Sequence, residues 1–163
     1  DESYPGSNVE DQEFSFRLAA AGHRMVFQPC AVVSHLHAGS LTRYLRKKYA
    51  IGYWKVKVHL RHPGRAVSDS HTPPVLKVQV GLAGLLLLGL ACAPFTRFGR
   101  RVAAGAGGAL LASTLPFSRW AWGRDRAVAA AAPALLVGRA LALGLGLAAG
   151  MAGQLYSRKD ARH

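Results

Sequence analysis

The stretch Val78–Phe95, VQVGLAGLLLLGLACAPF, contains no charged side chain and decides how the rest of the chain is interpreted. About 20 apolar residues in a helix, rising 1.5 Å each, cross the hydrocarbon layer of a bilayer. Residues 102–118 are also uncharged, and residues 127–157 carry only Arg139. The sequence therefore predicts an α-helical membrane domain of two to three helices within residues 75–157, at about 76–95, 102–117 and 127–151.

The second and third of these segments have features that qualify the prediction. The segment Val102–Phe117 has 16 residues, which reach only about 24 Å against roughly 30 Å of hydrocarbon. We therefore expect it to be a shallow or re-entrant helix if it is not a full span. A lipid-facing charge at the position of Arg139 would cost at least ~2.5 kcal/mol. We expect Arg139 to face other helices, a cavity or a lipid phosphate, with snorkelling to the interface as the alternative.

The residues before this domain are polar and strongly basic. The net charge of the whole chain is +13, and no acid occurs between Phe14 and Ser68. Basic residues that flank a span on its cytoplasmic side orient it and attract anionic lipid. Nucleic-acid binding is the weaker interpretation, because no known binding motif accompanies the charge. The two cysteines, Cys30 and Cys92, suggest a reducing compartment rather than a disulfide.

The first 74 residues are predicted to alternate between helices and strands. A helix is expected from about Val9 to Ala21, with Ser7 and Glu10 as a capping box or Asn8 as the cap, and with Gly22 ending it. Short β-rich runs follow at 24–27 and 30–36. A second helix is expected from 41 to about 60, after Ser40. It has an apolar and aromatic stripe and a basic face, so it could lie in the headgroup plane or be a core helix with a solvated basic face.

Three groups in this part could carry chemistry. Glu10 and Asp11 begin a helix, where acids are favoured by the dipole but could also serve as a general base. His35 and His37 alternate on a predicted strand and could meet one metal ion, although surface histidines are the simpler interpretation. The third group lies on the basic helix and could hold a phosphate or the membrane surface. Its members are Lys48, Trp54 and Lys55.

These groups occur in an order that resembles family 2 glycosyltransferases of the membrane-bound bacterial kind. The resemblance is close over roughly forty residues and looser through 41–60. It is carried by an acidic pair, an Arg-Leu, a glycine before an apolar run, a proline and a histidine. The corresponding stretches are Asp1-Glu2, Val9-Glu10-Asp11-Gln12-Glu13-Phe14-Ser15-Phe16-Arg17-Leu18, Ala21-Gly22-His23-Arg24-Met25-Val26-Phe27, Pro29 and Ala31-Val32-Val33-Ser34-His35.

The resemblance implies a fold and a reaction. Residues 1–39 would be the C-terminal part of a GT-A Rossmann-like α/β domain. They would be followed by an amphipathic interface helix and linker at 40–74, the membrane helices, and a basic tail at 158–163. The family's upstream DxD metal motif does not occur in these residues. We therefore expect the chain to be a fragment that is inactive alone.

The resemblance also implies roles for individual residues. Asp11 would be the catalytic base that deprotonates the acceptor hydroxyl, Glu10 would orient it, and His35 would reach the metal–diphosphate region. The cofactors would be a divalent metal, Mg or Mn, together with a nucleotide-diphosphate sugar. In place of the Q-x-x-R-W motif of processive members this chain has Lys48-Tyr49 and Tyr53-Trp54-Lys55, which favours transfer of a single sugar.

The expected protein is thus a multi-pass protein of the bacterial inner (plasma) membrane, with its catalytic part in the cytoplasm. Its partners would be a nucleotide-sugar donor, a lipid or glycan acceptor and the membrane, but no nucleic acid. Two other classes stay open. One is a non-catalytic membrane scaffold whose acids and histidines are structural, and the other is a basic protein that binds membrane surfaces or nucleic acid.

Overall fold

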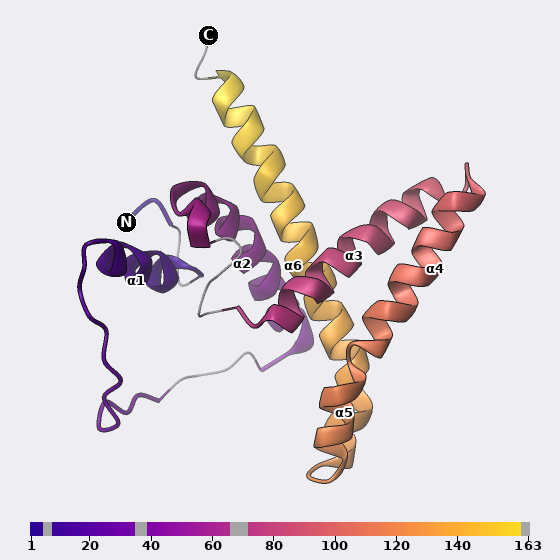
Figure 1. Cartoon of the computed structure of the whole chain (residues 1–163), viewed down its shortest axis with the longest axis horizontal. Helices are drawn as coiled ribbons and strands as arrows, with labels where there is room; N and C mark the ends of the chain where they lie inside the picture. The colour runs from indigo at the N-terminus through magenta and orange to yellow at the C-terminus, as the bar shows by residue number, and fades with distance from the viewer. Residues whose placement is uncertain (5–7, 35–38, 66–71, 161–163) are drawn as a thin grey trace.

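The computed structural model describes residues 1–4, 8–34, 39–65 and 72–160, and helices are the only regular elements formed by them (Figure 1). Helices α2, α3, α4 and α6 are long, and α1 and α5 are short. The elements in chain order are α1 (Glu10–Ala20), α2 (Leu41–Arg61), the 3-10 turn η1 (Pro63–Arg65), α3 (Pro74–Cys92), α4 (Arg97–Ala112), α5 (Leu115–Trp122) and α6 (Arg126–Asp160).

The predicted α/β fold is wrong for the residues that the structure describes. The runs 24–27 and 30–34 form no strand, and the backbone between them turns, with Ala31 N donating to Gln28 O at 3.1 Å. A strand persists only when a neighbouring strand accepts and donates its backbone hydrogen bonds. No described segment offers such a neighbour, and Phe27 and Val32 are 91% and 85% exposed. The described residues of this segment therefore have a composition typical of strands but form no sheet.

The two helices predicted before residue 74 are confirmed. Ser40 caps α2 by accepting a hydrogen bond from Arg43 N at 3.3 Å. Gly22 follows α1 with a φ of +80°, a left-handed conformation that favours glycine. The start of α1 differs from the expected capping box. Val9 is the N-cap, and the Glu10 carboxylate accepts from Asn8 N at 2.6 Å.

Helix α2 lies alongside the middle of α6, and glycines make this contact close (Figure 1). A methyl group on Gly52 would overlap the backbone carbonyl oxygen of Leu143, and one on Gly146 would overlap that of Tyr49. Gly146 and Gly150 form the G-x-x-x-G spacing that lets helices approach closely. The backbone of α2 thus packs against α6 along its glycine face, while Leu41, Tyr49 and Leu60 of its apolar stripe remain 55%, 42% and 50% exposed.

Helices α3 and α4 form a hairpin that diverges from α6 (Figure 1). A Cβ on Gly89 would lie 2.6 Å from Ala103 N, and one on Gly99 would lie 2.6 Å from the carbonyl carbon of Cys92. Where the hairpin meets α6, a buried cluster joins Ala83 of α3, Leu110 of α4 and Ala140 of α6. Small residues therefore allow close packing both within the hairpin and against α6.

Two helices in the described part of the chain are long and apolar enough to cross a membrane. They are Pro74–Cys92 and the Arg126–Tyr156 part of α6. Only 17% and 22% of their apolar windows is buried, so most of this surface is not covered by the rest of the molecule. The expected middle span at 102–117 is interrupted, because α4 ends at Ala112 and α5 begins at Leu115. Ser113 and Thr114 bond back to the carbonyls of Leu110 and Leu111 there.

A substitution at the α2–α6 contact should destabilise the fold. Gly146→Ala places a methyl group against the Tyr49 carbonyl, and overpacking of this kind typically costs about 1–3 kcal/mol. Thermal unfolding in detergent, followed by circular dichroism, should show a lower melting temperature. The matched control is Gly108→Ala on α4, where nothing lies within 4 Å of the added methyl group. Equal melting temperatures for the two variants would contradict the close packing described here.

Candidate functional site

The segment that carries Glu10 and Asp11 is fixed to α2 by a small apolar cluster. Phe16 of α1 and Val58 of α2 are 4% and 0% exposed. The ring of Phe16 meets that of His62 edge to face, with centroids 5.6 Å apart. The cluster consists of Tyr4, Val9, Phe16 and Val58, with Ile51 and Trp54 packed against it. Burial of these side chains holds α1 on one face of α2.

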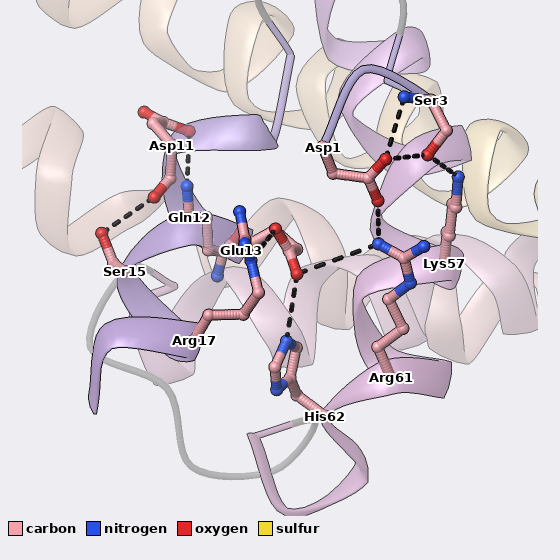
Figure 2. A network of polar contacts seen from close by, with 10 residues as sticks. All are labelled: Asp1, Ser3, Asp11, Gln12, Glu13, Ser15, Arg17, Lys57, Arg61 and His62. Carbon is pink, nitrogen blue, oxygen red and sulfur yellow. Dashed lines mark hydrogen bonds and ion pairs between the residues drawn. The ribbon is translucent and has the colours of Figure 1, made fainter. Parts of the chain in front are cut away.

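A buried carboxylate adds a polar contact to this packing (Figure 2). Glu13 is 1% exposed, and its Oε2 accepts from Arg17 Nε at 2.9 Å. Its Oε1 lies 3.5 Å from His62 Nε2 and 3.9 Å from Arg61 Nη1, and both of these residues lie at the C-terminal end of α2. A buried charge is tolerated only when it is paired, so these contacts define how α1 sits on the end of α2.

The first residues of the chain join the same contact. Asp1 pairs with Arg61, and Ser3 accepts from Lys57 (Figure 2). Tyr4 is 6% exposed and lies beneath Lys57, whose Nζ is 4.7 Å from the ring centroid. Burial raises the pKa of the Tyr4 phenol, against the lowering effect of Arg61. The N-terminal segment and α1 therefore form one unit on α2.

A pocket of about 460 Å³ lies between α1, α2, α3 and α6. Four cationic side chains line it, Lys48 and Lys55 from α2, Lys77 from α3 and Arg139 from α6. Asp11 is the only acid among its described lining residues. The remaining lining residues are Asn8, Val9, Gln12, Ile51, Gly52, His59, Thr72, Leu76, Val80, Leu143 and Leu147.

Arg139 belongs both to this pocket and to a chain of hydrogen bonds between helices. Its Nη2 donates to Gln79 Oε1 at 3.0 Å, and Gln79 Nε2 donates to Ser113 Oγ at 3.1 Å. Gln79 is 1% exposed. The guanidinium of Arg139 thus faces α3 and the pocket, which are two of the surroundings expected for a charge in this segment.

Two donors of the pocket lining have no acceptor. Within the described part of the chain, the buried atoms Gln12 Nε2 and Arg139 Nε make no hydrogen bond. Buried N–H groups are normally paired, so each unpaired one needs an explanation. Both are donors, and what they lack is a group that accepts hydrogen bonds.

Two of the pocket cations, Lys48 and Arg139, repel each other. The pKa of Lys48 is lowered, first by its burial, then by the positive charges of Arg139 and Lys47. The fold therefore holds Lys48 where its charged form is disfavoured. Its ammonium has the ring of Tyr44 nearby, at 5.2 Å from the centroid.

The structure brings some of the predicted site residues together and separates others. Asp11, Lys48 and Lys55 line the pocket, and Lys55 donates to Thr72 Oγ1. Glu10 lies outside it, at a shallow depression shared with Asp1 and Arg17. Trp54 also lies outside, with its ring against that of Tyr4 at 6.0 Å.

Metal binding at His35 lies outside the described residues, which omit 35–38. Among the described residues, no three of the His, Cys, Asp and Glu side chains are grouped so as to hold a metal ion. The described residues thus give no ligand set for a divalent metal, and no chemical step below is assigned to one.

Several polar lining residues were not named as site candidates from the sequence, among them Gln12, Lys77 and His59. Gln12 follows the acidic pair directly, Lys77 lies in the first turn of α3, and His59 lies one turn beyond Lys55. The spacing of Lys48, Lys55 and His59 is consistent with one face of a helix. Gln12 of α1 and Lys77 of α3 come next to them only because the three helices pack together. The sequence around these two residues therefore carries no local pattern that predicts their position.

Comparison of the chain with protein-family models, with curated proteins and with solved structures finds no match.

Removing the buried charge of Glu13 should loosen α1. Glu13→Gln keeps the shape but leaves Arg17, Arg61 and His62 without their shared anion, at a cost of about 1–3 kcal/mol. Hydrogen exchange of the α1 amides should become faster, while that of α6 stays the same. Glu2→Gln, at an exposed acid, is the control. Unchanged exchange in α1 would show that Glu13 does not hold it.

The charged form of Lys48 is disfavoured at its position, and this leads to a separate prediction. Lys48→Met keeps the apolar stem and removes the ammonium that burial and Arg139 disfavour. In detergent without phosphate-containing ligands, its melting temperature should exceed that of the original protein, as at sites kept for function rather than stability. Arg46→Met, on the exposed face of the same helix, should change little. A melting temperature lowered by Lys48→Met would rule out the repulsion.

Proposed function

We propose that this chain is the membrane-anchored part of a glycosyltransferase, which moves a sugar from a nucleotide-sugar donor to an acceptor held at the membrane. One observation carries the proposal: Asp11 opens onto the same pocket as Lys48, Lys55, Lys77 and Arg139, at the base of a helix long and apolar enough to cross a bilayer. The motif residues that resemble the transferase family support it. The proposal does not draw on the fold, since the described residues form helices only.

In the proposed reaction, the described residues of this chain carry out one step, the removal of a proton from the acceptor. Asp11 is exposed to the pocket mouth and could take the proton from an acceptor hydroxyl. The acceptor oxygen then forms a bond to the anomeric carbon of the donor sugar, and the bond from that carbon to the nucleotide diphosphate breaks. The diphosphate leaves with the bonding electron pair. A divalent metal would be supplied with the donor diphosphate, and no described residue is assigned to it.

The membrane setting follows from the surfaces of the helices. The α5–α6 corner exposes Trp120 and Trp122, 56% and 58% accessible. Arg124 lies 4.1 Å from the ring centroid of Trp120. Tryptophan and basic residues gather at the headgroup level of membrane proteins. We place the protein in the bacterial inner membrane as a multi-pass protein, with the basic pocket on the cytoplasmic side.

The role of Asp11 can be tested in the natural protein that contains these residues. In the original protein, Gln12 N donates to Asp11 Oδ1 at 2.7 Å. Asp11→Asn keeps the size of the side chain and an oxygen that can accept this hydrogen bond, but its amide cannot take up the proton. The rate of sugar transfer from radiolabelled nucleotide-sugars to membrane lipids should fall about 10²-fold or more. The donor KM should change little, because the change affects the chemical step.

Glu2→Gln serves as the control, since Glu2 is an exposed acid outside the pocket. A folded Asp11→Asn protein with the original transfer rate would reduce Asp11 to a helix-start acid. Together with an absence of transfer in the original protein, that result would favour a non-catalytic membrane scaffold.

A further inference from the structure

We infer that the tip of the α3–α4 hairpin binds the headgroups of anionic phospholipids. The hairpin tip consists of residues 93–101, which join the end of α3 to the first turn of α4. It lies at the end of the hairpin that points away from α6 (Figure 1). Lipid binding stands on the residues of the tip, and only the choice of leaflet rests on the proposed function.

The hairpin tip is positively charged, and no nearby acid in the sequence balances it. Arg97, Arg100 and Arg101 are exposed, and no Asp or Glu occurs between Ser70 and Arg124. Within the described part of the chain, none of the three guanidinium groups forms an ion pair. Their spacing of i, i+3 and i+4 places them on one face of α4. This face is therefore complementary to an anionic surface.

Two aromatic side chains accompany these charges. Phe95 and Phe98 are 86% and 76% exposed, so the described chain covers little of either ring. Apolar rings beside basic side chains are typical of protein surfaces at the boundary between lipid headgroups and acyl chains. There the rings leave water while the guanidinium groups stay among the phosphates. An inorganic anion would neutralise the arginines but would leave both rings in water.

The length of α3 places the hairpin tip at the level of the headgroups. This helix has 19 residues and is apolar enough to cross a membrane. It is about 28 Å long, close to the roughly 30 Å of hydrocarbon. Its first turns line the pocket that we place on the cytoplasmic side, so the tip reaches the outer leaflet. Basic residues there do not follow the positive-inside tendency, and binding of anionic lipid gives them a role.

Local hydrogen bonds hold the tip in one conformation. Phe95 N and Thr96 N donate to Cys92 O at 3.1 and 3.0 Å, and Gly99 N donates to Thr96 Oγ1 at 2.9 Å. A Cβ on Gly99 would lie 2.6 Å from the carbonyl carbon of Cys92, so α4 begins directly against the end of α3. Because the backbone is fixed in this way, the tip presents its arginines and rings together with little ordering on binding.

The charge of the tip is tested by the variant Arg97→Gln/Arg100→Gln/Arg101→Gln. Native mass spectrometry in a non-ionic detergent measures binding of phosphatidylglycerol, which is anionic, and of phosphatidylcholine, which has no net charge. The original protein should prefer phosphatidylglycerol. The tip variant should bind it about tenfold or more weakly, because three charged donors to the headgroup are lost. Binding of phosphatidylcholine should change less.

The matched control removes the same charge at three exposed arginines outside the hairpin. It is the variant Arg24→Gln/Arg43→Gln/Arg46→Gln. This protein should bind phosphatidylglycerol like the original one, and melting curves without lipid establish that both variants fold. Equal loss of binding in the two variants would show non-specific attraction to a basic protein and overturn the inference.

A second variant tests the rings and keeps the charge. Phe95→Ser/Phe98→Ser should weaken binding of phosphatidylglycerol about threefold or more, and it tests the inference even where the arginine variant does not fold. Its control is Val26→Ser/Phe27→Ser, at side chains that are 80% and 91% exposed outside the hairpin. Unchanged lipid binding without the two rings of the tip would contradict the inference. Tighter binding of a single-stranded oligonucleotide than of the lipid would make the tip a nucleic-acid surface and also overturn it.

These outcomes are separable from those of the proposed function, because lipid binding in detergent depends neither on sugar transfer nor on topology. The leaflet is tested with Phe98→Cys in a protein that also carries Cys30→Ser and Cys92→Ser. A membrane-impermeant maleimide should label it from the outer side of oriented vesicles. Labelling from the cytoplasmic side only would overturn the placement in the outer leaflet.

Discussion

The close approach of α2 to α6 is the contact on which the rest of the structure depends. Gly52, Gly146 and Gly150 leave no side chain between the two backbones. Because α2 lies this close, Lys48 and Lys55 come within the same pocket as Arg139. A larger residue at any of these glycines would separate the helices and with them the charges. The basic pocket is therefore a consequence of packing rather than of sequence proximity.

This packing also constrains how a membrane could surround the molecule. Helix α6 has 35 residues, about 52 Å of helix against roughly 30 Å of hydrocarbon. The part beside α2 must keep Lys48, Lys55 and their neighbours near water or headgroups, since charge in lipid is costly. The length of α6 leaves room for this.

The sequence predicts much of the helical structure, because the relevant signals are local. Ser40 and Gly22 each act within one or two turns, and the uncharged run Val78–Phe95 is one continuous stretch of sequence. The strands at 24–27 and 30–36 were predicted from equally local β-propensity. Over the described residues 24–34 no strand forms, because a strand depends on a partner elsewhere in the chain and the described residues provide none. The middle segment at 102–117, expected to be shallow or re-entrant if not a full span, is divided between α4 and α5, since Ser113 and Thr114 bond back to the preceding carbonyls.

The site was predicted only in part. Asp11, Lys48 and Lys55 were named as candidates, and the structure places them together, whereas Glu10 and Trp54 lie elsewhere. Gln12 and Lys77 enter through tertiary packing that no local pattern encodes. The most direct measurement of the central claim is the dipolar coupling in solid-state NMR between ¹³C labels at the Cα of Gly52 and the carbonyl carbon of Leu143, whose atoms the structure places in direct contact. We expect strong coupling between these two carbons. Its absence in a folded protein would contradict the account.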